Sequence, residues 1–85
     1  MSNNQSITVI ITYAQKNKVY NIEIDPSTKV QELINEFYEM LHPNGQEKII
    51  LKYQGTQLNP NGTFEEQKVR KGTQIDLLVE TQGGL

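Results

Sequence analysis

The sequence predicts an α+β fold in which a single helix covers one face of a mixed sheet of four or five strands. Three segments, 7–13, 19–24 and 74–80, alternate apolar and polar residues with the period of two that a strand with one buried face requires. Another segment carries the apolar stripe of an amphipathic helix, at Val30, Leu33, Ile34, Phe37 and Leu41. At 85 residues, the chain can close one hydrophobic core and is too short for two.

The first two strands are expected to form a hairpin, preceded by a disordered leader, residues 1–5, that offers nothing to bury. β-Branched residues dominate 7–13, where Ile10 is the apolar residue on the outer face. The alternation stops at 14–17 and resumes with Tyr20, Ile22 and Ile24 facing inward. We expect Asn17 to take a positive φ in the turn, because asparagine tolerates that conformation better than most residues.

The helix is predicted to be about three turns long. Pro26 ends the second strand, and Thr28 with Gln31 has the spacing of a capping box, in which the two side chains cap the first turn. His42 precedes a proline, which disfavours the helical conformation and stops the helix there. The other face of the helix is acidic and is expected to be solvated, with Glu32, Asn35, Glu36 and Glu39.

The second half of the chain contains a third strand, 48–53, a tight turn, 54–57, and a polar loop. Leu58 returns to the core and is placed on a short fourth strand. Phe64 and Val69 are isolated apolar residues in the loop and are predicted to anchor it, and Thr63 is predicted to cap a short helical turn with Glu66. Lys71-Gly72 supplies a turn before the last strand.

The last strand is expected to close the domain, residues 6–80, and to continue into a flexible tail, residues 81–85. Leu78 is the apolar residue on its outer side. After Glu80, no large apolar side chain follows until Leu85, and the tail contains Gly83-Gly84. An exposed end with two glycines indicates a substrate for another protein.

Composition argues against several classes of function. A net charge of −2 with scattered lysines gives no surface for nucleic acid. The chain has no cysteine and only one histidine, His42, so we expect no metal site, no cofactor, no catalytic residues and no enzyme activity. The longest early apolar run, Val9-Ile10-Ile11, is too short for a membrane span. We expect a cytoplasmic monomer.

Several blocks of the chain, between residues 7 and 84, resemble ubiquitin and its relatives. The block 22–27 resembles the second strand and the acidic-Pro-Ser entry to the helix, 50–58 resembles the third strand with its Gly-x-Gln-Leu turn, and 76–79 with Gly83-Gly84 resembles the last strand and diglycine end. The resemblance implies the ubiquitin-like β-grasp fold, with the last strand central beside the first.

The resemblance also implies a ubiquitin-like protein modifier. A processing peptidase would remove Leu85, and an activating enzyme using ATP would then adenylate the Gly84 carboxylate. A cysteine would take up the acyl group as a thioester, and a conjugating enzyme would join it to lysines of target proteins. Glycines at positions 83 and 84 suit this chemistry because they lack Cβ and pass through a narrow channel. Lys71 matches one chain-linkage lysine of ubiquitin.

A partner surface is predicted on the outer face of the sheet and the tail, at Ile10, Ile50, Lys52, Asp76, Leu78, Glu80 and Gln82. Lys52 and Asp76 stand where the apolar patch of ubiquitin has its central isoleucine and its histidine, whereas Ile50 and Leu78 would form a shifted patch. Glu80 and Gln82 replace arginines of ubiquitin. These departures favour a dedicated enzyme set and a bacterial or archaeal type of relative.

Three alternatives remain open from the sequence. A sulfur carrier with this fold would receive sulfur as a terminal thiocarboxylate, although such carriers end at the second glycine. A ubiquitin-like interaction domain would bind partners through the sheet and would never be conjugated. Gly83-Gly84 would otherwise be only a flexible end.

Overall fold

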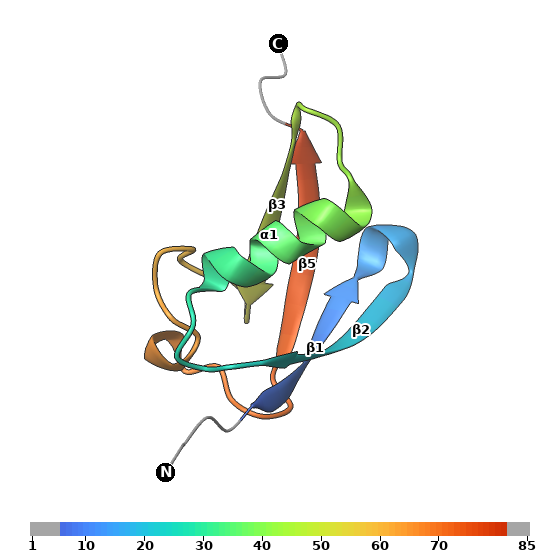
Figure 1. Ribbon diagram of the computed structural model, residues 1–85. Helices are drawn as coiled ribbons and strands as arrows, with labels where there is room; N and C mark the ends of the chain where they lie inside the picture. Colours follow the sequence, from blue (N-terminus) through green and yellow to red (C-terminus); the bar gives the residue numbers. More distant parts are fainter. Residues whose placement is uncertain (1–5, 82–85) are drawn as a thin grey trace.

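The computed structural model describes residues 6–81, which form one mixed five-stranded sheet with one α-helix lying across it (Figure 1). The strand order is β2-β1-β5-β3-β4. The strands are β1 (Ile7–Tyr13), β2 (Lys18–Ile24), β3 (Glu47–Tyr53), β4 (Thr56–Gln57) and β5 (Gln74–Thr81). β5 runs parallel to β1 and antiparallel to β3, so the last strand is central, as the sequence resemblance implied. The expected leader, 1–5, and tail residues 82–85 lie outside the described residues.

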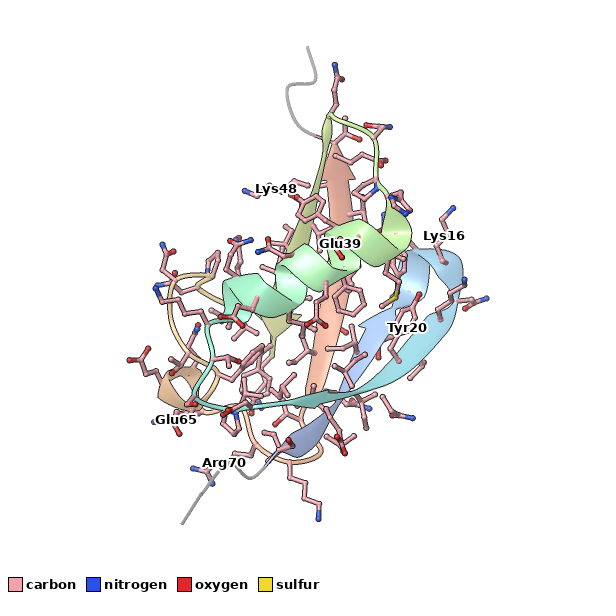
Figure 2. The ribbon with its side chains drawn as sticks, in the orientation of Figure 1. Lys16, Tyr20, Glu39, Lys48, Glu65 and Arg70 are labelled. Carbon is pink, nitrogen blue, oxygen red and sulfur yellow. The ribbon has the colours of Figure 1, made fainter. Side chains whose placement is uncertain are left out.

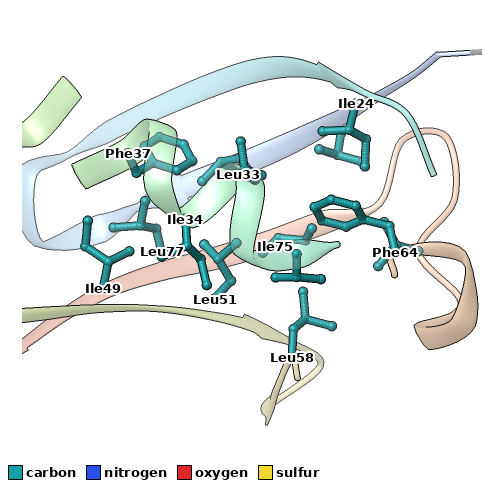
Figure 3. Packing of buried hydrophobic residues seen from close by; sticks show 14 of the residues in the cluster. Ile24, Leu33, Ile34, Phe37, Ile49, Leu51, Leu58, Phe64, Ile75 and Leu77 are labelled. Atoms are coloured by element: carbon teal, nitrogen blue, oxygen red, sulfur yellow. The ribbon is translucent and has the colours of Figure 1, made fainter. Parts of the chain in front are cut away.

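Helix α1 (Val30–Leu41) covers the inner face of the sheet with its apolar stripe (Figure 3). Among the apolar residues of the predicted helix and strands, Phe37, Leu51, Leu58, Ile75 and Leu77 are buried. Tyr20, Ile22 and Leu41, which were also predicted to face inward, are half-buried and pack against this core. The ring of Phe37 also meets the ring of Tyr20 edge-on, with centroids 5.6 Å apart and an interplanar angle of 65°. The period-two and helical patterns therefore place the core correctly.

The start of α1 corrects the predicted capping box. The N-cap residue of α1 is Lys29, whose side chain makes no capping hydrogen bond. The Thr28 hydroxyl donates instead to the Asp25 carbonyl at 2.7 Å. The free N–H groups of the helix are instead satisfied by a distant loop: the Val30 N–H donates to the Gly62 carbonyl at 3.0 Å, and the next N–H to the Pro60 carbonyl at 2.9 Å. A neighbouring backbone thus does what side-chain caps do elsewhere.

The connection from β2 to α1 is held by a carboxylate. Asp25 accepts hydrogen bonds from the Ser27 backbone N–H at 2.9 Å and from the Ser27 hydroxyl at 2.8 Å. These bonds, the backbone one first, hold the pKa of the Asp25 carboxyl below its ordinary value because they favour the charged form. Asp25 therefore stabilises this turn as a carboxylate.

Two short 3₁₀ turns confirm predictions made for the loops. Asn17 has a φ of 57° directly after η1 (Ala14–Lys16). At η2 (Glu65–Gln67), the Thr63 hydroxyl accepts from the Glu66 N–H, and the Glu66 carboxylate accepts from the Thr63 N–H. Phe64 is 1% exposed, so it does anchor the loop in the core, as does Val69.

The β3 edge and the last strand differ slightly from expectation. Leu58 is not on β4 but follows it, and its N–H donates to the Leu51 carbonyl at 2.8 Å. On the same edge, the Tyr38 hydroxyl of α1 accepts from the Ile49 N–H at 3.0 Å. β5 extends through Thr81, one residue beyond the predicted end.

No helix within residues 6–81 is long and apolar enough to cross a membrane.

Candidate interaction surface

The outer face of the sheet, opposite α1, carries most of the residues predicted to contact partners. The antiparallel register of β3 and β5 places Lys48 opposite Glu80, and Ile50 opposite Leu78. Lys52 in turn lies opposite Asp76. An apolar pair is therefore bracketed by two pairs of opposite charge, with the cations on β3 and the anions on β5. Directly opposed charges of this kind stabilise a sheet modestly.

The predicted shifted patch of Ile50 and Leu78 is wrong at Ile50, because this side chain is buried and only 6% exposed. It lies in the middle of a strand, directly opposite Leu78, and Lys48 and Lys52 flank it on the same face. Long lysine side chains cover apolar neighbours with their aliphatic parts. Alternation alone marked Ile50 as outward-facing, but its neighbours leave little of it for a partner to touch.

A shallow depression lies beside this ladder, where β1, β5 and β3 meet. It is lined mainly by apolar atoms of Thr12, Ala14, Gln15, Lys52, Asp76, Leu77 and Leu78. Leu78 is half-buried there, whereas Asp76 is exposed. Three predicted surface residues are thus brought together. Gln15 was not predicted to belong to this surface, because a polar residue in a turn carries no periodic signal.

Strands β1 and β2 add two further apolar positions, Ile10 and Val19. Ile10 is half-buried and pairs with Asn21 on β2. Val19 pairs with Thr12 and is 63% exposed, which makes it the most exposed of the large apolar side chains in the described chain. The sequence could have indicated this exposure, because Val19 alternates with the inward-facing Tyr20 and so belongs to the outer face. Single exposed apolar residues are ordinary on protein surfaces, so Val19 alone defines no site.

A separate groove lies between the end of β2 and the first half of α1. Its lining includes four carboxylate residues, Glu23, Asp25, Glu32 and Glu36. The sequence placed the two helix glutamates on a solvated face, and the structure adds Glu23 of β2 and Asp25 of the following turn to them. Four negative charges along one groove would repel an acidic partner and attract a basic one.

The remaining predicted residues lie at the two ends of β5. Glu80 is exposed near the end of the strand, and Lys71 is exposed in the turn before its start, next to Gly72 with a φ of 82°. Lys71 is therefore at the opposite end of the strand from the tail. Gln82, Gly83, Gly84 and Leu85 lie beyond the described residues. Within residues 6–81, no group of three or more His, Asp or Glu side chains is arranged to hold a metal ion.

A mixed sheet with the last strand central and one helix across it is the ubiquitin-like β-grasp fold, and solved structures bear this out. Ubiquitin of Caldiarchaeum subterraneum superposes with a TM-score of 0.77 at 23% identity, covering 94% of this chain and 100% of that one. A computationally designed protein based on the template of human erythrocytic ubiquitin gives 0.76 at 29% identity, covering 93% and 98%. A structure described as molecular mimicry of SUMO that promotes DNA repair gives 0.74 at 19%, covering 91% and 95%.

The family follows from the sequence match. The family model described as ubiquitin-2 like Rad60 SUMO-like matches residues 7–79, from the first residue of β1 to Val79 in the second half of β5. The chain belongs to this family of ubiquitin-like domains. No curated protein matches the sequence. The fold and family define a ubiquitin-like domain, a class that acts through contacts with other proteins.

Proposed function

We propose that this protein is a ubiquitin-like modifier, joined to lysines of target proteins through the carboxylate of Gly84. The observation that carries the proposal is that Gly83-Gly84 begin two residues after Thr81, where the central strand of a ubiquitin-like domain ends. Two residues without Cβ allow a close backbone approach by an enzyme. The central position of β5 in the sheet gives the attachment point a rigid base.

The chemistry would be carried out by partner enzymes. A peptidase first hydrolyses the peptide bond after Gly84 and releases Leu85. The Gly84 carboxylate attacks the α-phosphate of ATP and displaces pyrophosphate, and an enzyme thiolate then attacks the acyl-adenylate and displaces AMP. The amine of a target lysine attacks the thioester, which forms the isopeptide bond and returns the thiol. On this proposal the chain is a substrate in the cytoplasm, and its own side chains supply no catalysis.

A second function is favoured by the family match. The matched domain is described as Rad60 SUMO-like, and one similar structure is described as mimicking SUMO. On this account the domain binds partners through the outer face of the sheet or the acidic groove and is never conjugated. Gly83-Gly84 would then be dispensable.

The two functions are separated by the fate of Gly84 in the cells from which the sequence comes. The chain carries an N-terminal affinity tag and is expressed in full, truncated after Gly84, or with 83–85 deleted. The modifier should give covalent conjugates from the first two chains and none from the third. Trypsin cuts after Lys71, so a modified target lysine should carry residues 72–84.

The control is Leu85→Ala, which changes the residue to be removed but leaves both glycines in place. It should conjugate as the full chain does if the peptidase reads the two glycines. Linkage peptides that retain residue 85 would refute the proposal. A chain truncated after Gly84 that forms no conjugates, while the deleted chain binds the same partners as the full one, would establish the binding domain instead.

A further inference from the structure

The pairing between β1 and β5 stops before β5 ends. β1 and β5 pair in parallel through Ile10 with Gln74, Ile11 with Ile75, and Thr12 with Asp76. The chain then turns away from the sheet into η1, whereas β5 continues to Thr81 with only β3 beside it (Figure 1). Among the strands of residues 6–81, the last residues of β5 thus have β3 as a neighbour on one side and no strand on the other.

A single side chain fills this gap. The Gln15 Oε1 accepts a hydrogen bond from the Val79 N–H at 3.0 Å, and the Gln15 Nε2 donates to the Val79 carbonyl at 3.4 Å. A continued parallel strand would contact the same two backbone groups. The shorter bond has ordinary hydrogen-bond geometry, and the longer one lies beyond the usual range and adds less. The contact joins residues 64 positions apart in the sequence.

The position of Gln15 is itself fixed by the turn that carries it. The Asn17 N–H donates to the Ala14 carbonyl at 3.0 Å, and Asn17 closes the turn with a φ of 57°. Gln15 lies between them, and it borders both the depression on the outer face and a cleft on the helix side that includes Leu41 and His42. The glutamine amide therefore stands between two hollows, at the place where a strand is missing.

We propose that Gln15 is a positioning residue for the C-terminal segment. It acts through the backbone of Val79 and holds the end of β5 in line with the sheet, so that Gly83-Gly84 continue from a fixed base. This inference rests on the proposed function. A pre-ordered base lowers the conformational-entropy cost that arises when an enzyme binds the tail. Gln15 should therefore affect the concentration needed for activation and not the rate at saturation.

The test compares Gln15→Ala and Gln15→Met, which both remove the amide, with Lys16→Ala, an exposed residue of the same turn (Figure 2). Met keeps a long side chain, so it separates the hydrogen bonds from simple contact. Amide hydrogen exchange measured by NMR should be faster at Val79 by about threefold to tenfold in both Gln15 variants, the change expected for one lost hydrogen bond. Exchange in Lys16→Ala should match the wild type.

The functional readout uses chains truncated after Gly84, labelled at the N-terminus, in an ATP-supplied extract of the source cells. The Gln15 variants should need a severalfold higher concentration for half-maximal conjugation and should reach the same plateau rate. Unchanged exchange at Val79 would show that Gln15 does not hold the backbone of Val79. Faster exchange with an unchanged half-maximal concentration would overturn the positioning role. If the wild type forms no conjugates, the proposed function fails, and exchange at Val79, Glu80 and Thr81 still decides whether Gln15 holds the strand end.

Discussion

Phe37 gives the most direct test of how the helix is seated on the sheet. Its side chain is 0% exposed and lies in the middle of α1, among core residues of both layers (Figure 3). Truncation of a buried phenylalanine to alanine costs about 3–5 kcal/mol, because buried apolar area is lost and a cavity remains. The whole domain is expected to be stable by roughly 5–10 kcal/mol. Phe37→Ala should therefore leave a folded but weakened protein.

Urea unfolding followed by circular dichroism measures this loss as a lower midpoint with an unchanged slope. Glu36→Ala is the matched control, since Glu36 is the exposed neighbour on the same helix and should shift stability by no more than about 0.5 kcal/mol. If Phe37→Ala costs less than about 1 kcal/mol, or no more than Glu36→Ala, the assigned face of the helix is wrong.

The edge-on contact of the Phe37 and Tyr20 rings adds a specific term to this loss. Such pairs contribute about 0.5–1.5 kcal/mol beyond the burial of area. A double-mutant cycle with Phe37→Leu and Tyr20→Leu should show a coupling of that size, because both substitutions keep an apolar side chain. Strict additivity of the two losses would show that the ring geometry contributes nothing.

The remaining predictions concern other parts of the domain. Because its folded pKa is lowered, Asp25 stabilises the fold above the ordinary carboxyl range, and this contribution disappears as the pH falls through the folded pKa. Ser27→Ala removes one donor and should raise the Asp25 pKa in an NMR titration; an unchanged pKa would contradict the assigned cause. Thr63→Ala should cost about 1 kcal/mol in urea melts, since it removes the hydroxyl that accepts from the Glu66 N–H, and a loss within error would show that this cap is idle. A receptor that selects ubiquitin through its apolar patch should not bind in titrations, because Lys52 places a charge at the centre of that surface; micromolar binding would count against this reading.

Local patterns were sufficient where the structure depends on neighbours in the sequence. The period of two placed Ile75 and Leu77 in the core, and the helical stripe placed Phe37 there. The left-handed conformation of Asn17 follows from its own side chain and its turn. The isolated apolar residue Phe64 indicated an anchored loop, because a large apolar side chain in a polar segment is stabilised by burial.

Tertiary structure decided the features that depend on residues far apart in the chain. Ile50 alternates like an outward-facing residue, but it lies opposite Leu78 in the middle of the strand and is only 6% exposed. Thr28 has the spacing of a cap, but the carbonyl of Gly62 arrives from another loop and takes its place. A hydrogen bond forms with whichever partner the fold brings into range, and alternation reports only the side of a strand, not what lies over it. The amino-acid sequence thus determined which segments are strands and helix and which residues are core, whereas the contact of Gln15 with Val79, and with it the base of the diglycine segment, was decided by the way distant strands meet.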